Sequence, residues 1–380
     1  MRTSSEHTDG DHRPRARHLH DNRCVGPTTR GEIDRRCDDA RHNVDADATD
    51  GVVASVHRTV AATWPPPRWA DVPVLVAISG GADSVAMLRA LLTIDVADPD
   101  RFSQTPRFVV AHYNHRRRGE ASEGDQRFVA DLADAVGLPF EHHRETDLDI
   151  ADEATMRERR RAFLVDVARR YGCRYVATAH HRNDHVETVL HHLFRGSGLA
   201  GLSGIDAFGQ WPSDLVVARP MRELAASVLR QYLSSIGQDF RIDASNDDTR
   251  YTRNWLRHEL LPMIRSRFPG ADEAIVNAAR AIRQSHQALD QSAERLIDEH
   301  VRYADDVVQI EVMDWPPAVA AVAIAKMWDH SGWPRRNLNR DAIENLTALI
   351  RGDSHAAMVL PGAVRADRIG RTVRLQRQRD

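Results

Sequence analysis

The segment Ser79–Ser84, which reads Ser-Gly-Gly-Ala-Asp-Ser, has the residue types and spacing of a phosphate-binding loop. Two adjacent glycines permit backbone angles that other residues avoid, so successive N–H groups can turn toward one anion. The apolar run Val74–Ile78 precedes the segment, and a helical pattern follows it and adds the positive end of a helix dipole. We predict that the loop binds the phosphates of a nucleotide through six residues: Ser79, Gly80, Gly81, Ala82, Asp83 and Ser84.

Asp83 has two interpretations at the start of the expected helix. By itself, an aspartate at this position is most simply an N-cap. Next to a triphosphate, it is also well placed to hold Mg²⁺. The loop differs from the GxxxxGK[ST] pattern because it has no Gly-Lys pair, and Lys326 is the only lysine of the chain. The pattern therefore excludes a lysine clamp on the phosphates.

Short apolar runs alternate with helical patterns in the middle of the chain. The runs are Val74–Ile78, Phe108–His112, Tyr175–Ala179 and Leu215–Ala218, and the helices cover about residues 84–94, 122–136, 153–171 and 184–194. Strands separated by helices at this spacing predict an α/β fold with a parallel sheet. Ligands of such sheets bind at the carboxyl ends of the strands, near the point where the strand order reverses. The phosphate-binding loop follows one of these strands.

After Trp255 the sequence patterns become mainly helical. Amphipathic stretches cover about residues 254–267, 272–300, 316–330 and 340–351. We expect Pro262 and Pro269 to break the first of them. We expect short strands over Met358–Leu375, around the turn Pro361–Gly362.

These patterns predict three regions. Residues 1–50 are poor in large apolar side chains and are expected to form a disordered extension. Residues 51–250 are expected to form the nucleotide-binding catalytic domain. Residues 251–380 are expected to form a smaller, mainly helical region with short C-terminal strands.

The bulk composition excludes several classes of protein. With 42% hydrophobic and 28% charged residues, the chain is expected to form ordinary globular cores. We expect a cytoplasmic protein that does not bind a membrane, because no apolar run reaches about 18 residues and no signal-peptide core follows Met1. Cys24, Cys37 and Cys173 have no metal-binding spacing. The net charge of −3 means that any RNA contact must come from local basic surfaces.

The hexad Ser79–Ser84 resembles the PP-loop of the ATP pyrophosphatases, which cleave ATP between its α- and β-phosphates. The resemblance implies a parallel-sheet PP-loop domain of the adenine nucleotide α-hydrolase-like fold, with ATP and Mg²⁺ as cofactors and Asp83 as the metal ligand. It does not by itself choose among the family's substrates. The family includes synthetases of NAD, GMP and argininosuccinate as well as several tRNA-modifying enzymes.

Further segments resemble the tRNA(Ile)-lysidine synthases within this superfamily. His112–Gly119 is similar to their H-x-N-H-x-x-R stretch, and Glu153–Arg160 is similar to their E-x-x-x-R-x-x-R helix. Thr178–Thr188 and the following Arg-Gly-Ser-Gly turn at 195–198 resemble a third element. Asp243–Arg257 resembles the D-x-S-N-x-D-x-x-Y-x-R-N-x-(I/L)-R element. Together these similarities span about residues 72–270.

The resemblance implies a set of site residues. The catalytic candidates are Asp83, Arg157, Asp184, Glu187 and His180. The tRNA-binding candidates are His115, Arg118, Arg160, Arg195, Asn246, Tyr251, Arg253, Asn254 and Arg257. Among these, we expect Asp83 to hold Mg²⁺, Asp184 to contact the amine of the substrate lysine, and Arg157 to stabilise charge in the transition state.

This chain departs from the family at one point of the third segment. The family usually has Asp-Asp-Gln where this chain has Asn183, Asp184 and His185. The second carboxylate is kept and the first is lost. The loss puts in doubt any role of position 183 in metal binding or acid–base chemistry.

The family's reaction implies the partners. The C2 oxygen of the wobble cytidine, in the CAU anticodon of tRNA(Ile), attacks the α-phosphate of ATP and releases pyrophosphate. The side-chain amine of free L-lysine then displaces AMP, and the product reads AUA instead of AUG. The sequence leaves open whether the chain forms a homodimer.

Three other functions compete with this one. A PP-loop tRNA thiolase would work through cysteines or an iron–sulfur cluster, but only Cys173 lies in the expected catalytic domain. An amide synthetase acting on a small metabolite would leave the element Asn246–Arg257 unexplained. A tRNA-binding protein without catalysis would fit Asn183 and His185, but the intact loop with Asp83 argues against it.

Overall fold

The computed structural model describes residues 50–95, 102, 105–147, 153–212, 214–242, 252–304, 306–334 and 338–378. Apart from Asp50, the extension predicted over residues 1–50 lies outside the described residues. The first described helix covers residues 50–63. Within the described ranges, no helix is both long and apolar enough to cross a membrane.

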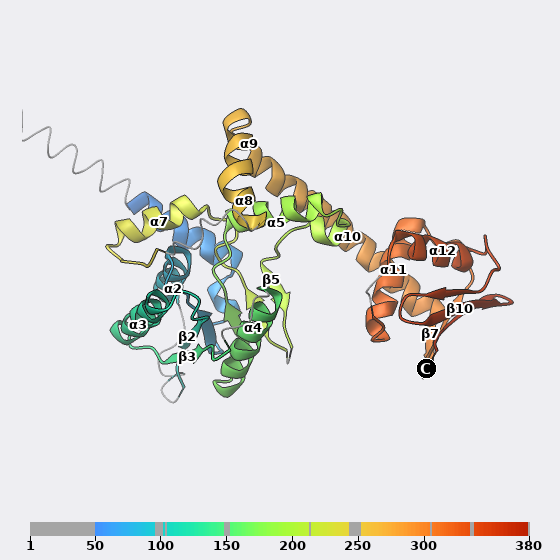
Figure 1. Ribbon diagram of the computed structural model, residues 1–380, viewed down its shortest axis with the longest axis horizontal. Coiled ribbons are helices and arrows are strands. Elements are labelled where there is room, and N and C mark those ends of the chain that lie inside the picture. Colours follow the sequence, from blue (N-terminus) through green and yellow to red (C-terminus); the bar gives the residue numbers. More distant parts are fainter. Residues whose placement is uncertain are drawn as a thin grey trace, which may run out of the picture. The chain divides into compact units, whose positions relative to one another are not determined.

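A six-stranded sheet forms the centre of the N-terminal part of the fold (Figure 1). Its strands are β1 (Val74–Ala77), β2 (Phe108–Asn114), β3 (Phe140–Arg144), β4 (Tyr175–Ala177), β5 (Phe208–Gln210) and β6 (Val216–Ala218), in the order β3-β2-β1-β4-β6-β5. All neighbouring pairs are parallel except β5 and β6. The predicted α/β class with a parallel sheet is therefore confirmed.

Two of these strands were not predicted from the sequence. β3 reads Phe-Glu-His-His-Arg, lies at the edge of the sheet and leaves its last three residues exposed, so it has no apolar run. β5 is three residues long, and its residues are only partly buried or exposed. Edge strands with one solvated face lack the pattern that identifies central strands.

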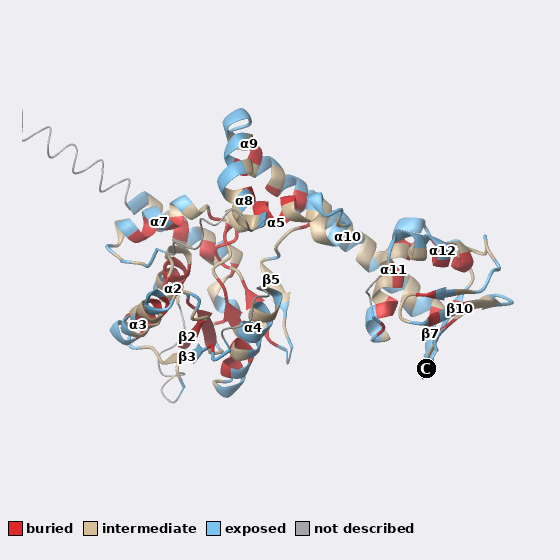
Figure 2. Ribbon diagram, in the orientation of Figure 1, coloured by how far each residue is buried: buried red, intermediate tan, exposed pale blue. Residues whose placement is uncertain are grey.

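Helices cover both faces of this sheet. α2 (Ala82–Ile94), α3 (Glu120–Ala135) and α7 (Ala226–Ser235) cover one face, and α4 (Glu153–Arg170) covers the other. α5 (Arg182–Phe194) and α6 (Leu199–Leu202) pack mainly against each other and against the helices after residue 251. Along β1, Val74 and Val76 face a core that includes α2, α3 and α7, whereas Leu75 and Ala77 face a core that includes α4. This alternation follows from the two-residue period of a strand, and the central strands are accordingly buried on both faces (Figure 2).

The strand order reverses between β1 and β4. β1 pairs with β2 on one side and with β4 on the other, and the chain continues outward from each. In an open parallel sheet, this point leaves a crevice at the carboxyl ends of the strands, where ligands bind. The loop after β1 and the segment after β4 flank that crevice.

A helical segment follows at Thr252. It consists of α8 (Thr252–Trp255), a π-helical turn (Leu256–Leu260), α9 (Leu261–Arg267) and the long α10 (Ala271–His300). The prediction that Pro262 breaks the helix was wrong. Pro262 stands in the first turn of α9, where its missing N–H is tolerated, and the preceding turn widens to the π form.

The remaining residues form a second hydrophobic core around a sheet. The sheet contains β7 (Val301–Ala304), β8 (Val307–Glu311), β9 (Met358–Leu360), β10 (Val364–Ile369) and β11 (Thr372–Arg377), all antiparallel, and packs with α11 (Pro317–His330) and α12 (Arg340–Arg351). The predicted strands around Pro361–Gly362 are present, but β7 and β8 were missed. In sequence, β7 continues directly from α10, which hides its start.

Glu145, immediately after β3, ties the sheet edge to α4. Its Oε2 accepts a hydrogen bond from Tyr113 Oη at 2.6 Å, and its Oε1 accepts one from Arg159 at 2.9 Å and others from the next two backbone N–H groups. The hydrogen bond from Tyr113, with these other donors, lowers the pKa of Glu145 to about 2. Because α4 carries Arg157 and Arg160, this carboxylate helps to position two predicted site residues.

We expect Glu145→Gln to lower the free energy of unfolding by about 2 kcal/mol at pH 7, because it weakens a buried charge-assisted network. A carboxyl group with a depressed pKa stabilises the fold above its unfolded pKa, and this contribution disappears as the pH falls toward the folded pKa. The difference between wild type and variant should therefore shrink from pH 7 to pH 3 in urea unfolding. Glu158→Gln, an exposed change on α4, is the matched control; an equal difference at both pH values would contradict this account.

Candidate functional site

The loop after β1 is braced by its own serines. Ser84 Oγ accepts a hydrogen bond from the Ser79 N–H at 3.2 Å and donates one to Gly81 O at 2.9 Å, and Ser79 Oγ accepts one from the Gly81 N–H at 3.3 Å. Gly80 has φ +94°, a conformation that strains residues with a side chain. The result is a tight turn that leads directly into the N-terminus of α2, as a phosphate-binding loop requires.

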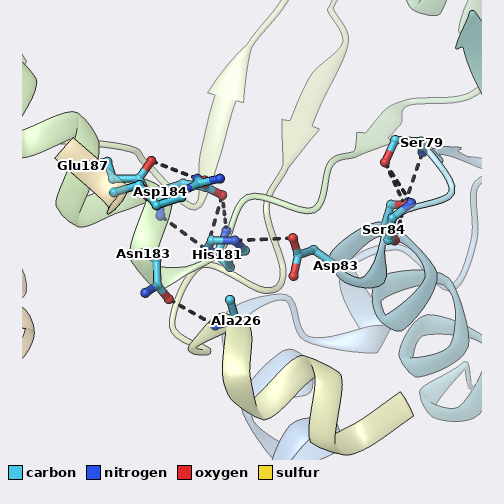
Figure 3. A network of polar contacts seen from close by, with 10 residues as sticks. Ser79, Asp83, Ser84, His181, Asn183, Asp184, Glu187 and Ala226 are labelled. Carbon is cyan, nitrogen blue, oxygen red and sulfur yellow. Dashed lines mark hydrogen bonds and ion pairs between the residues drawn. The ribbon is translucent and has the colours of Figure 1, made fainter. Parts of the chain in front are cut away.

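The segment after β4 enters α5 through a capping box. His181 Nδ1 accepts a hydrogen bond from the Asp184 N–H at 3.3 Å, and Asp184 Oδ2 accepts one from the His181 N–H at 3.0 Å. Because Nδ1 is the acceptor, the ring hydrogen lies on Nε2. His181 Nε2 lies 3.4 Å from Asp83 Oδ2, so the histidine links the phosphate-binding loop to α5 (Figure 3).

His181 is the main site residue that the sequence prediction missed. Its side chain is buried, and although burial alone lowers its pKa, Asp83 and Asp184 together raise that pKa above the ordinary value. A signal was present: His181 stands between a strand and a helix, three residues before an aspartate. A histidine in place of serine or threonine is outside the usual capping-box pattern, so spacing alone did not identify it.

The α5 carboxylates bind Arg257, which comes from the π-helical turn. Arg257 contacts both oxygens of Glu187, with Nε–Oε1 and Nη2–Oε2 distances of 2.7 and 2.9 Å, and reaches Asp184 Oδ1 at 3.1 Å. The Glu187 side chain is only 4% exposed, so the two-pronged pair compensates its buried charge. The structure therefore brings Asp83, Asp184, Glu187 and Arg257 together around one histidine. π-Helical turns often occur at functional sites.

The residues around Asp83 fit a magnesium ion. Asp83 Oδ1 is buried and has no hydrogen-bond partner, which leaves an acceptor available for a cation. Mg²⁺ in nucleotide sites is commonly held by one or two carboxylates together with phosphate oxygens and water. Among the described residues, no group of three or more acidic, histidine or cysteine side chains forms a complete metal site. This donor set matches a metal that arrives with a nucleotide.

His180 and His115 lie in cationic, half-buried surroundings. Burial, together with the charge of Arg160, lowers the pKa of each to about 4. His180 Nδ1 lies 3.1 Å from Thr178 Oγ1, whereas His115 Nδ1 is buried without a partner among the described residues. Both rings are therefore neutral near pH 7. Arg157 precedes Arg160 by three residues on α4, which places the two on one helical face.

The remaining predicted tRNA-binding residues are spread over several elements. Arg118 pairs with Asp125 on α3, Arg195 is exposed at the C-terminal end of α5, and Arg253 and Asn254 lie on α8. Asn246 and Tyr251 lie outside the described residues. Arg195 follows Asp184 by eleven positions, or about 16 Å of helix, so it does not belong to the cluster around His181. These tRNA assignments stay predictions.

The two departures from the family pattern have structural roles here. Asn183 Oδ1 accepts a hydrogen bond from the Ala226 N–H at 3.1 Å, at the first residue of α7 (Figure 3). His185 is buried, and its Nδ1 accepts a hydrogen bond from the Ile205 N–H at 2.9 Å. Both positions thus serve as acceptors for backbone groups of neighbouring segments. An aspartate at position 183 could make the same bond.

The sequence comparisons with known proteins agree on one family. A model of the PP-loop domain matches residues 56–264. A tRNA(Ile)-lysidine synthase of Rhodopirellula baltica is 35% identical over 339 residues, which cover 79% of this chain and 85% of the relative. A synthase of the same name from Geobacter sulfurreducens is 37% identical, over 60% of this chain and 48% of the relative. A synthase of the same name from Thermus thermophilus is 35% identical over 309 residues, which cover 79% of this chain and 56% of the relative.

We expect Asn183→Asp to preserve both stability and activity, because a carboxylate accepts the same N–H bond and suits a helix N-terminus. Asn183→Ala should lower the free energy of unfolding by about 1 kcal/mol through loss of the cap. Urea unfolding and ATP turnover measure the two effects, with Ser227→Ala on α7 as the control. A tenfold gain of turnover in Asn183→Asp would show instead that the lost carboxylate is catalytic.

Proposed function

The chain belongs to the tRNA(Ile)-lysidine synthases and is an ATP-dependent ligase with a PP-loop domain; from this premise we propose that it joins free L-lysine to C2 of the wobble cytidine in the CAU anticodon of tRNA(Ile). The observation that carries the proposal is the contact of His181 with both Asp83 and Asp184. It unites the nucleotide-binding loop with a pair of carboxylates in a single site. Such a reaction belongs where tRNA and ATP meet, in the cytoplasm.

The first step adenylates the base. The cytidine O2 attacks the α-phosphorus of ATP, the bond to the bridging oxygen of the β-phosphate breaks, and pyrophosphate leaves. The N–H groups of the loop and the N-terminus of α2 stabilise the charge that develops on the leaving group. Asp83 would hold Mg²⁺, which would supply additional positive charge at the phosphates. Arg157 on α4 is the proposed source of further charge stabilisation.

The second step needs a neutral amine. At pH 7, removing the proton from a lysine side chain costs about 4–5 kcal/mol, so a nearby proton acceptor is expected. Arg257 binds both oxygens of Glu187 but only Oδ1 of Asp184, and the Asp184 side chain is 26% exposed against 4% for Glu187. We therefore favour Asp184 as the group that binds the lysine amine. The amine attacks C2, AMP leaves, and the modified anticodon reads AUA instead of AUG.

Neutral His115 and His180 suit a site that must bind an unstacked base. A neutral imidazole can accept or donate a hydrogen bond at a base edge without adding charge, and single-stranded bases are commonly read on such edges. Positive charge for the RNA backbone would come from arginines such as Arg160 and Arg253, which bind phosphate through a planar fork.

The direct test is transfer of radiolabelled lysine. The purified full-length protein is incubated with ATP, Mg²⁺, labelled lysine and unmodified tRNA(Ile) carrying CAU, with methionine tRNA of the same anticodon as control. We expect ATP-dependent label in tRNA(Ile) alone. Equal label in both tRNAs, or none in either, would contradict the proposed substrate.

Asp184→Asn separates the two steps. The amide keeps the shape and the bonds to backbone but loses the charge that attracts an ammonium. We expect the KM for lysine to rise about tenfold to a hundredfold, with tRNA-dependent exchange of pyrophosphate into ATP retained within about threefold. The exposed change Asp239→Asn, on the segment after α7, serves as control. Loss of exchange with an unchanged KM for lysine would place Asp184 in the adenylation step instead.

A further inference from the structure

Two arginines bind one carboxylate beside the phosphate-binding loop. Asp125, on α3, has a side chain that is only 10% exposed. Its Oδ2 lies 2.6 Å from Arg118 Nη2, and its Oδ1 lies 3.1 Å from Arg241 Nε. Arg118 and Arg241 thus hold the carboxylate from two sides, and Arg241 places a positive charge beside the loop, where it favours a nearby anion.

Arg241 is the arginine of this pair that contacts the loop itself. Its backbone N–H donates to Gly80 O at 2.9 Å, and the residue forms a parallel bridge with Gly81. Its Cγ lies 3.6 Å from the position that a Cβ on Gly80 would take. The side chain therefore runs along the loop, from the two glycines toward Asp125.

The outer part of the Arg241 side chain is available to a ligand. The side chain is 47% exposed, and Asp125 uses only its Nε. The two terminal nitrogens have no hydrogen-bond partner among the described residues, and Nη2 lies next to α3, 3.3 Å from the position that a Cβ on Gly124 would take. The bond from Nε leaves both terminal nitrogens to bind a second anion, and arginine recognises phosphate through such paired nitrogens.

The chemistry at the loop calls for such a cation. Cleavage of ATP at the α-phosphate releases pyrophosphate, which carries several negative charges. The only lysine of the chain, Lys326, is bound by Asp290 and Glu294 on α10. A lysine is therefore not available for the leaving group, and arginine is the long cationic side chain that can reach it.

We propose that Arg241 is a further nucleotide-binding residue, whose terminal nitrogens bind the β- and γ-phosphates of ATP and the pyrophosphate formed from them. Asp125 positions the guanidinium, and the backbone pairing of Arg241 with the Gly80–Gly81 turn keeps it beside the loop. The inference rests on the proposed use of ATP at this loop. It is independent of which nucleophile or which RNA the enzyme uses.

The test is binding of three ligands to the full-length protein by calorimetry, without tRNA or lysine. ATP and inorganic pyrophosphate contain the phosphates that Arg241 would contact, whereas AMP lacks them. We expect Arg241→Gln to weaken the binding of ATP and of pyrophosphate about tenfold to a hundredfold, and to leave the affinity for AMP within about twofold of wild type. The control is Arg144→Gln, which removes an arginine of β3 that pairs with Glu123 on α3. It should change none of the three ligand affinities.

Arg241→Lys distinguishes lost phosphate binding from a folding defect, because it keeps the positive charge but lacks the planar guanidinium group. We expect it to recover pyrophosphate binding to within about fivefold of wild type. Equal weakening of AMP and ATP, or a lysine variant as weak as the glutamine variant, would overturn the proposal and leave Arg241 as a support of the loop. The assay contains no RNA, so its result can be interpreted even if the lysine-transfer test fails. If the wild-type protein did not bind ATP, the ATP site itself would be refuted.

Discussion

His181 contacts carboxylates on both sides of the crevice between β1 and β4, and the geometry of the site depends on that arrangement. Its Nδ1 is fixed by the first turn of α5, so its Nε2 hydrogen is directed toward Asp83. The same residue therefore orients the carboxylate that would meet the nucleotide and the one that would meet lysine. The pairing of β1 with β4 brings the loop and α5 close together, and His181 joins them by direct side-chain contact.

The balance of charge follows from this arrangement. Asp83, Asp184 and Glu187 gather near one histidine, and Arg257 compensates two of them through three hydrogen bonds. The arginine is supplied by a π-helical turn just before Pro262, a local irregularity at the start of a helical region. Beside the phosphate-binding loop, Arg118 and Arg241 both pair with Asp125. An acidic group suited to an ammonium and a basic group suited to phosphate thus lie in the same domain.

Local patterns in the sequence were enough to predict the loop Ser79–Ser84 and the helices α2, α3, α4 and α5, but not the helix over residues 50–63 or α7. These features depend on neighbours within a few residues. The roles of His181 and Arg241 depend on partners about 100 or more positions away, and spacing cannot show such pairs. β3 and β7 were missed for a related reason: β3 is a polar edge strand, and β7 continues directly from a helix, so neither has an apolar run of its own.

The central claim is that the loop and the α5 carboxylates form one site in which ATP reacts with the RNA base. Exchange of labelled pyrophosphate into ATP tests it most directly, because exchange occurs only when the adenylated intermediate forms reversibly. Wild-type protein should catalyse exchange with tRNA(Ile) present and lysine absent, and should show none with lysine alone. Exchange that requires lysine and proceeds without tRNA would mean that the amino acid is adenylated, and would contradict this account of the site.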